Sequence, residues 1–473
     1  MKIGRMISLS WFGGSESKDV VARQVAEMHQ QVDGVWLCVE CEGNAPAEQT
    51  QMVELKIDQR EELELSQLFY EECLTPLFHH LRKGFSFNQH HYFAYRRWNK
   101  GLAEALAALY KEGDILWLHD AHWIPLARYI RELQPSMPIA ITFNTPFPGA
   151  EVLKTLPVAN EIIEDLFHFD LVGFSRSTDL AGFNESASDI VGALTLADKR
   201  LKMNSQMLKA AVYPAVVAEQ NTCSEPESQR QVNTAFQMFS GDKLVASLDT
   251  PCWFSNLSNR NQAYEVFLKE NATLAKDVVF GSAITPYAVE AAHVKSTVHR
   301  WKSSLSELND HWKSYSRRPF RAVNLYGQSF TDQLEVPALL RHSKVFLDMS
   351  MSCYGLSNHA DFWTHQNPQD PGVLVVSSLA IDGNDLEGAL VVHPLDIVGI
   401  ARAVKEALLM PLSERKVRYE KLGAVYRGLS AERRRTKFTF DLMEQSRKNR
   451  QAASASRGIE PIKTPSERAT MHH

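Results

Sequence analysis

Polar side chains that can bind a sugar cluster in the segment Trp117-Leu118-His119-Asp120-Ala121-His122. Carboxylate and imidazole groups hydrogen-bond hydroxyls, and both can take part in proton transfer. Open α/β sheets bind ligands at the carboxyl ends of strands, so we expect His119, Asp120 and His122 to contact substrate, with Asp120 as the candidate catalytic residue. A structural interpretation stays open, in which Asp120 caps a helix starting near Ile124 and the histidines are hydrogen-bonded core groups.

Two later apolar runs also end in polar residues. One ends in Phe143-Asn144-Thr145 and the other in Phe174-Ser175-Arg176. Polar groups that follow successive parallel strands meet at one rim of a sheet, so we expect both segments to lie near Asp120. Asn144 is therefore a further candidate for substrate binding.

A glycine pair near the amino terminus is a candidate phosphate contact. Gly13 and Gly14 precede a predicted helix that contains Val20 and Val21. Backbone N–H groups and the dipole at the start of a helix favour an anion. The same pair is typical of an ordinary turn, and that interpretation also stays open.

The elements that would position these residues are short apolar strands alternating with amphipathic helices. In the first half, apolar runs predict strands over 34–39, 115–119, 139–143 and 171–174, with helices around 21–28 and 102–109. Nearly continuous apolar runs are typical of strands covered on both faces. The pattern predicts an α/β fold with a doubly wound, Rossmann-like parallel sheet.

A second alternation of the same kind follows the polar stretch 219–233. It predicts strands over 244–248, 322–325, 345–349, 373–376 and 390–393, followed by a helix over 397–408. We expect a first domain over 1–214, a second over 215–425, a helix over 426–450 packing back on the first domain, and a disordered tail over 451–473. Pattern alone equally describes a hinged small-molecule-binding protein.

Composition and charge narrow the range of partners. The chain has 473 residues, enough for two buried cores, and its net charge of −5 gives no reason to expect nucleic acid or a membrane surface. No apolar run reaches the roughly 18 to 20 residues that cross a bilayer, and residues 1–12 are too short and mixed for a signal peptide. The six cysteines form no disulfide framework, and Cys38 and Cys41 are expected to be structural thiols. We therefore expect a cytoplasmic protein.

Several segments, in chain order, resemble the trehalose-6-phosphate synthase family of retaining glycosyltransferases. Gly13-Gly14 is similar to that family's glycine pair, 117–122 to its W-x-H-D-Y-H signature, 146–148 to H-x-P-F-P, and 170–174 to D-L-x-G-F. Residues 370–377 and 389–394 are similar in the second half. The resemblance implies the GT-B fold, in which two doubly wound parallel-sheet domains face a central cleft.

The resemblance also implies an activity and further site residues. The family transfers glucose from UDP-glucose to glucose 6-phosphate with retention and without a metal, and no cofactor is expected. On alignment with the family, His80 and Tyr92 take the places of the residues that flank the sugar phosphate, and Asn144 takes the place of the histidine in H-x-P-F-P. Asp361 takes the place of the ribose-binding glutamate. Expected partners are a nucleotide sugar and a sugar phosphate, together with a second copy of the chain or an active paralogue.

The segments that resemble the diphosphate site differ from the family. Its R-L-D-x-x-K motif supplies two cations, but Ser247 and Cys252 stand at those positions here, and Ser352 replaces the arginine of R-D-G-M-N-L. Loss of one buried charged hydrogen-bond partner costs about 2 to 5 kcal/mol, so the donor site is expected to be altered. The arginines that could compensate are Arg176, Arg260 and Arg341.

Two hypotheses follow from the resemblance and its gaps. The first is a glycosyltransferase of trehalose-6-phosphate synthase type with an altered donor site. The second is a catalytically silent relative that senses a sugar phosphate or regulates an active enzyme. The retained Asp120 and Asp361 favour the first, and the changes at Ser247, Cys252 and Ser352 favour the second.

Overall fold

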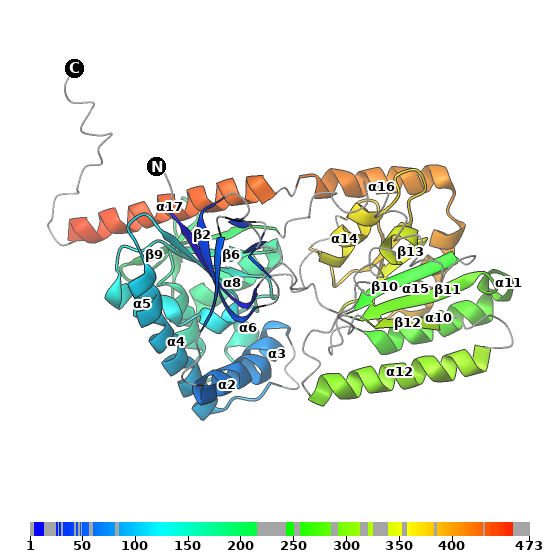
Figure 1. The fold of residues 1–473 in the computed structure, drawn as a ribbon, viewed down its shortest axis with the longest axis horizontal. Coiled ribbons are helices and arrows are strands. Elements are labelled where there is room, and N and C mark those ends of the chain that lie inside the picture. The colour runs from blue at the N-terminus through cyan, green and yellow to red at the C-terminus, as the bar shows by residue number, and fades with distance from the viewer. Residues whose placement is uncertain are drawn as a thin grey trace, which may run out of the picture. The chain divides into compact units, whose positions relative to one another are not determined.

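The computed structural model describes residues 4–456 except 14–24, 27, 30–31, 42–43, 46–47, 49, 56–59, 81–84, 215–242, 250–255, 285–291, 313–319, 325–338, 352–356, 383–385 and 429–430. The chain divides into two compact units (Figure 1). Unit 1 comprises Met1–Pro214 and Glu432–His473, and unit 2 comprises Ala215–Ala431. None of the described helices has the length and apolar character needed to span a membrane.

Unit 1 is built on one sheet whose strands follow the order β3-β2-β1-β4-β5-β6-β9-β8-β7. The strands are β1 Met6–Gly13, β2 Gly34–Cys41, β3 Thr50–Glu54, β4 Ile115–His119, β5 Ile139–Phe143, β6 Leu171–Phe174, β7 Leu194–Thr195, β8 Arg200–Met203 and β9 Gln206–Val212. From β3 to β6 this is the strand order of a Rossmann fold, and neighbouring strands there run parallel. The chain's connections reverse direction between β1 and β4, which is the topological switch point of the sheet.

Contrary to the prediction from the sequence pattern, the unit 1 sheet is not purely parallel, because one edge is antiparallel. β8 pairs with β9, and β7 with β8, in antiparallel register. The turn between Met203 and Gln206 joins β8 directly to β9. So short a connection allows only an antiparallel pair, because a parallel pair needs a crossover of a dozen or more residues.

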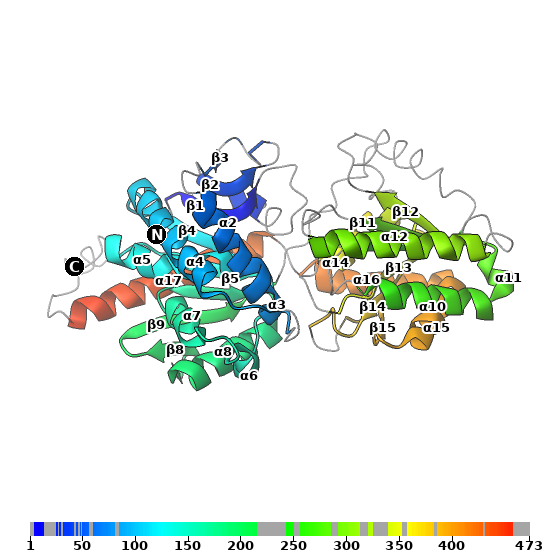
Figure 2. The same cartoon turned by 90° about the horizontal axis from the view of Figure 1, so that it is seen from below.

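Helices cover both faces of the unit 1 sheet. They are α2 Arg60–Phe69, the π-helix η1 Tyr70–Leu74, α3 Thr75–Phe78, α4 Gln89–Leu109, the short 3₁₀ helix η2 Ala121–Trp123, α5 Leu126–Leu133, α6 Ala150–Leu153, α7 Ala159–Leu166, α8 Ser177–Val191 and α17 Ala431–Ser456. Figure 2 shows α2 and α4 in front of the strands and α17 behind them. Successive residues of β4 divide between the two layers: Leu116 and Leu118 join the core on the α4 side, and Ile115 and Trp117 join the core on the α17 side.

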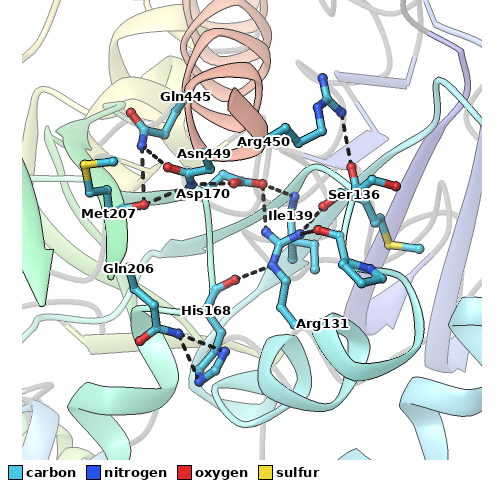
Figure 3. Close-up of polar contacts among 12 residues, drawn as sticks. Arg131, Ser136, Ile139, His168, Asp170, Gln206, Met207, Gln445, Asn449 and Arg450 are labelled. Atoms are coloured by element: carbon cyan, nitrogen blue, oxygen red, sulfur yellow. Dashed lines mark hydrogen bonds and ion pairs between the residues drawn. The ribbon is translucent and has the colours of Figure 1, made fainter. Parts of the chain in front are cut away.

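Helix α17 is part of the core of unit 1, although it comes last in the described chain. Phe438 packs on Trp117 with ring centroids 5.1 Å apart, and Asp441 accepts hydrogen bonds from Lys209 at 2.7 Å and from Tyr213 at 2.6 Å. Farther along, the Asn449 amide donates to Asp170 at 2.8 Å (Figure 3). These contacts attach the helix to the sheet along its length.

The prediction of a disordered tail over 451–473 is wrong for its first six residues. The terminal helix begins at Ala431 and continues to Ser456, so residues 451–456 are helical rather than part of a disordered tail. Gln445 and Asn449 bind the backbone of Met207, and Arg450 binds that of Ser136, which holds the last turns of the helix in place. Residues 457–473 lie outside the described part of the chain.

Unit 2 contains a second Rossmann-type sheet, with strand order β12-β11-β10-β13-β14-β15. Its strands are β10 Lys243–Asp249, β11 Val278–Ile284, β12 Phe320–Asn324, β13 Val345–Asp348, β14 Val373–Ser377 and β15 Leu390–Val392. All neighbouring strands run parallel, and the topological switch point lies between β10 and β13.

Two helical layers cover the unit 2 sheet. The helices are α10 Leu257–Glu270, α11 Ala272–Ala275, α12 Ala292–Trp312, α14 Ser357–His365, α15 Ile397–Leu409 and α16 Leu412–Tyr426. One apolar core joins α10, α12 and α15 to the sheet, and the other joins α14 and α16 to its opposite face. Figure 1 shows α10 and α12 on one side of these strands and α14 and α16 on the other.

The strands predicted from apolar runs are confirmed in both units, with ends that agree to within two residues. Val25 and Met28 of the first predicted helix are buried, whereas Val21 lies outside the described residues. The expectation of free thiols is wrong at one position, because Cys38 is disulfide-bonded. Cys73 is a buried free cysteine.

Candidate functional site

The candidate site of unit 1 lies at the carboxyl ends of β1, β4 and β5. Leu9 of β1 pairs with Leu118 of β4, and His119 of β4 pairs with Thr142 of β5. These parallel registers bring the residues after His119 and after Phe143 to the same rim, beside Trp11 near the end of β1. Three of the expected site residues, Asp120, His122 and Asn144, follow these strand ends.

Asp120 joins the ends of β4 and β5 through four hydrogen bonds. One carboxylate oxygen accepts from the Ala121 N–H at 2.7 Å and the Thr145 hydroxyl at 2.8 Å. The other accepts from the backbone N–H groups of Asn144 at 3.1 Å and Thr145 at 3.2 Å. A carboxylate has about four acceptor sites, so the described residues occupy all of them.

The environment of Asp120 agrees with the structural interpretation, in which this residue caps a helix. Its side chain accepts from the first residue of η2 and so caps that 3₁₀ helix, which starts three residues earlier than the helix expected near Ile124. Burial raises the pKa of the Asp120 carboxyl, and the donors from Thr145, Asn144 and Ala121 oppose that rise. The geometry is that of a carboxylate that fixes two strand ends relative to each other.

His119 points to the face of the sheet covered by α17. Its ring lies edge-on to Trp117 at 4.0 Å between centroids, and its Nδ1 is 3.1 Å from the Thr142 hydroxyl. Its Nε2 is buried and has no hydrogen-bond partner among the described residues. Burial first, then the positive charge of Arg434, lowers the pKa of His119 well below its usual range, so the ring is neutral.

His122 lies on the opposite face, between two other aromatic rings. Its ring stacks on Tyr70 of η1 at 3.5 Å between centroids and on Trp11 at 4.8 Å. Burial lowers the pKa of His122 to about 3, so this ring is also neutral at physiological pH. Its Nδ1 has no hydrogen-bond partner within the described structure.

Asn144 continues the rim toward β6. Its side-chain oxygen accepts from the Ser175 hydroxyl at 3.2 Å, while its amide nitrogen is buried with no partner among the described residues. Arg176 follows Ser175, and its guanidinium binds Asp179 at 2.6 and 2.8 Å. Asn144 therefore retains an unused donor, whereas Arg176 already has a carboxylate partner.

The remaining unit 1 candidates lie elsewhere in the fold. Tyr92 is buried, packs on Phe69 at 5.4 Å between centroids and donates its hydroxyl proton to Glu161, so in the described structure it is a core residue. His80 is exposed and has a left-handed backbone with φ of 61°, a conformation that is uncommon for a residue with a side chain. No contact joins either residue to Asp120 in the described structure.

Packing against the neighbouring strand requires a glycine at position 13. It is the last residue of β1, and a Cβ added there would lie 2.7 Å from the Cβ of Cys38. That distance is too short for any side chain, so the neighbouring strand β2 excludes other residues. Gly14 and the helix expected after it lie outside the described residues.

In unit 2, a buried ion pair occupies the switch point at the end of β10. Both carboxylate oxygens of Asp249 lie 2.6 Å from Nη1 of Arg260, which is fully buried on α10. Ser247 donates to Asp249 at 3.0 Å and contacts Ser282 of β11 at 2.9 Å. Burial alone would lower the pKa of Arg260, but the Asp249 charge outweighs it and raises that pKa.

A second buried pair lies at the end of the neighbouring strand β13. Nε2 of His359 on α14 is 2.8 Å from Asp348, whose other oxygen accepts from the hydroxyl of Ser350 at 2.6 Å. Burial would raise the pKa of the Asp348 carboxyl, but the His359 and Ser350 contacts outweigh it and lower that pKa. Asp361 lies half-buried two residues farther along α14.

Sequence reasoning missed both buried pairs and the aromatic stack. Arg260 was expected as a free cation, and the structure instead binds it to Asp249. The available signal was an aspartate at the end of each of two predicted strands, Asp249 and Asp348, with a basic side chain eleven residues farther along the chain in both cases. Arg341 is half-buried ahead of β13, and Cys252 and Ser352 lie outside the described residues.

Comparisons with known proteins agree with this architecture. The profile of "Glycosyltransferase family 20" matches residues 13–431. A trehalose-6-phosphate synthase of Sodalis glossinidius is 31% identical over 366 residues, covering 76% of each chain.

Solved structures show the same fold. An alpha,alpha-trehalose-phosphate synthase (UDP-forming) from Burkholderia xenovorans, in complex with glucose-6-phosphate, superposes with a TM-score of 0.84 at 24% identity, covering 93% of this chain and 100% of that one. One from Burkholderia vietnamiensis superposes with a TM-score of 0.81 at 25% identity, covering 93% and 99%. The expected α/β fold of GT-B type is confirmed. The chain therefore belongs to glycosyltransferase family 20, as a relative of the trehalose-6-phosphate synthases.

Proposed function

We propose that this protein transfers a sugar from a nucleotide sugar to a sugar phosphate, with a donor site altered from that of its relatives. The family match over residues 13–431 carries the proposal, because it spans both switch points. The relative from Burkholderia xenovorans is named as UDP-forming and holds glucose 6-phosphate. UDP-glucose and glucose 6-phosphate are therefore the first donor and acceptor to test.

On the acceptor side, the proposal assigns positioning to Asp120 and contact to its neighbours. Asp120 already accepts four hydrogen bonds, so taking a proton from a substrate would require one of them to break. It fixes the loop that carries Asn144, whose amide N–H groups can donate to a sugar hydroxyl. Retaining transfer can proceed with the donor's own diphosphate close to the acceptor hydroxyl, so the protein mainly positions the two.

On the donor side, the proposal rests on Asp361 and on the changed diphosphate segment. A carboxylate in the first turns of α14 can bind two ribose hydroxyls, as the resemblance implies. The leaving diphosphate needs preorganised donors or cations. Ser247 provides a hydroxyl where relatives have an arginine, and Arg260 is bound to Asp249, so the proposed donor site has less positive charge than theirs.

A second candidate function is a catalytically silent sensor of a sugar phosphate. It is favoured by one observation, the commitment of Arg260 to a buried ion pair, which removes a cation that could have compensated for Ser247. In this alternative the acceptor half still binds ligand. The two functions therefore differ in donor binding and in transfer.

The first experiment is calorimetric titration of the full chain with UDP-glucose, with and without glucose 6-phosphate, followed by an assay of UDP release. Micromolar donor binding and UDP release that depends on glucose 6-phosphate would support the enzyme. Binding of glucose 6-phosphate without donor binding would support the sensor. Binding of neither ligand would contradict both.

A variant of Asp361 sharpens the donor assignment. A hydrogen bond to a charged group contributes about 1.5 to 3 kcal/mol, so D361N should weaken UDP-glucose binding roughly ten- to hundredfold and leave glucose 6-phosphate binding unchanged. D277N is the matched control, because Asp277 is an exposed residue of the same unit, in the turn before β11. Equal donor binding by D361N and the parent chain would remove Asp361 from the proposed site.

A further inference from the structure

An aromatic stack stands at the switch point of unit 1. Trp11, His122 and Tyr70 form three layers, with His122 in the middle at 4.8 Å from Trp11 and 3.5 Å from Tyr70. The planes of neighbouring rings differ by 29° and 23°. The stack is therefore nearly parallel, unlike the edge-on contacts that Phe147 makes with its neighbouring phenylalanines.

The stack joins three different elements at the rim where ligands bind in this class of sheet. Trp11 lies near the end of β1, level with Asp120, because Leu9 pairs with Leu118 and the strands are parallel. His122 belongs to η2 after β4, and Tyr70 begins the π-helix η1. π-Helical turns are frequent at functional sites. Trp11 and Tyr70 remain partly exposed, whereas His122 between them is buried.

The chemistry of the stack suits an uncharged, hydroxyl-rich ring. Burial holds the pKa of His122 at about 3, so the stack carries no charge at neutral pH. The faces of aromatic rings are electron-rich and attract polarised C–H groups, such as those on the face of a pyranose. Two buried polar atoms have no partner within the described structure: Nδ1 of His122, and Oδ1 of Asn99, whose amide donates to the His122 carbonyl at 3.1 Å.

We propose that Trp11, supported by His122 and Tyr70, is a stacking platform for the pyranose ring of the sugar phosphate. Naming the ligand as a sugar phosphate rests on the proposed function, whereas the platform itself rests on the ring geometry. A nucleobase is the other ring that could stack there. The candidate ribose ligand Asp361 belongs to unit 2, so we assign the nucleotide to that unit and the acceptor sugar to the stack.

The test measures the fluorine NMR signal of Trp11 in the full chain. The protein contains nine tryptophans, and labelling with 5-fluorotryptophan gives each a fluorine resonance. W11F identifies the Trp11 resonance by its loss, and W301F does the same for Trp301, a buried tryptophan of unit 2. Titration with glucose 6-phosphate should shift the Trp11 resonance saturably and leave the Trp301 resonance in place. A Trp11 shift with UDP and none with glucose 6-phosphate would overturn the assignment in favour of a nucleobase.

Calorimetry on variants measures what the ring contributes. W11A should bind glucose 6-phosphate about tenfold more weakly, and W11F, which keeps an aromatic face, less than about threefold. W11L keeps a larger apolar side chain than alanine but no aromatic face, so it should behave like W11A, which guards against a W11A chain that does not fold. F93A is the alanine control, since Phe93 is 47% exposed on α4 of the same unit, and it should bind like the parent chain.

The platform and the proposed function fail in different ways. If W11L binds glucose 6-phosphate as tightly as the parent chain, the platform is wrong even when UDP release is normal. If the parent chain binds glucose 6-phosphate through Trp11 but releases no UDP, the platform stands and the transfer proposal fails. If the parent chain binds no glucose 6-phosphate, the platform is overturned as well.

Discussion

The two switch points share one strand order but hold opposite kinds of chemistry. In unit 1 the ends of β1 and β4 carry the aromatic stack and one carboxylate, Asp120, which is bound by backbone N–H groups and a hydroxyl. In unit 2 the ends of β10 and β13 carry two buried pairs, Asp249 with Arg260 and Asp348 with His359. One edge is held by neutral donors, and the other by side-chain charge.

This difference decides what each edge can offer a ligand. Neutral rings and an unused amide donor can contact a sugar without first giving up an internal partner. A guanidinium that already binds a buried carboxylate must leave that carboxylate uncompensated before it can bind a phosphate, which is expensive inside a protein. The comparison predicts that substitutions in the buried pairs of unit 2 act mainly on stability, and that the unit 1 edge keeps its capacity to bind.

The largest expected effect is the loss of Arg260. R260M leaves Asp249 buried without a counter-charge, and breaking one partner of such a pair costs about 3–5 kcal/mol. We expect unit 2 to lose that much stability, measured by hydrogen exchange of the β10 and β13 amides. Unit 1 strands β4 and β5 serve as the internal reference.

A double variant tests the reason for that loss. R260M/D249L removes both charges, so it should recover much of the stability that R260M loses, because well-packed apolar residues often replace a buried pair at little cost. If R260M alone costs less than about 1 kcal/mol, the pair does not hold the edge of unit 2 and the comparison fails on that side.

The corresponding change in unit 1 is Asp120 to Asn. The amide of D120N presents N–H groups to the backbone donors of Asn144 and Thr145, so at least one buried donor loses its partner. Such a loss costs about 1–3 kcal/mol, and hydrogen exchange in β4 and β5 should report it. D198N is the control, because Asp198 forms an exposed ion pair with Arg200, and such pairs contribute little to stability. Equal exchange in D120N and D198N would show that Asp120 does not join the strand ends.

A pH series isolates the neutral stack of unit 1. The folded-state pKa of His122 is about 3, below the usual histidine value of 6.5, so folding disfavours its protonation. Its neutral form stabilises the fold fully above pH 6.5, and that stability is lost as the pH falls from 6.5 toward 3. H122F keeps the ring and removes the titration, so its advantage over the parent chain should grow by about 1.4 kcal/mol per pH unit in this window.

The measurement compares the two chains at each pH, which cancels the intrinsic pH dependence of amide exchange. H90F is the matched control, because His90 is exposed at the start of α4. A constant difference between H122F and the parent chain from pH 7 to 4.5 would mean that His122 titrates normally and that the stack is open to water.

The sequence predicted the strands that contain a nearly continuous apolar run and missed β1, in which polar residues break the run. β4 and β5 have the expected bounds because every residue in them is buried. β1 was missed because Ser8 and Ser10 interrupt its apolar pattern. Both serines are buried, and they bind His29 at 2.8 Å and Trp36 at 2.8 Å. Their partners are more than twenty residues away, so no local pattern could reveal them.

Contacts between residues that are distant in the sequence also limited what could be predicted of the site. The rim formed by Asp120 and Asn144 follows from strand ends, and the sequence predicted it. Arg260 was read as a compensating cation because its partner Asp249 is fixed only when α10 packs beside β10. Similarly, the stack of Trp11 on His122 needs the pairing of β1 with β4, which the sequence did not predict.

The smallest expected effect concerns Asn449 of α17, which attaches the helix to unit 1 through a neutral amide donor. The Asn449 amide donates to Asp170 at 2.8 Å and to the Met207 carbonyl at 2.9 Å (Figure 3). Asp170 keeps Arg131 at 2.8 Å and the Ile139 N–H at 3.0 Å when Asn449 is removed, so no buried charge is left alone. N449A should therefore cost only about 1–2 kcal/mol in unit 1, seen as faster exchange in β9 and α17.

Position 449 also offers a charge test on the same contact. N449D places a second carboxylate beside Asp170, so it should destabilise unit 1 more than N449A does, and the excess should shrink in high salt if the contact is partly hydrated. R447A on the exposed side of α17 is the control and should change little. If N449D and N449A lose the same stability, Asn449 does not contact Asp170 in solution, and α17 is held by its apolar face, through Phe438 and Leu442, rather than by its polar contacts.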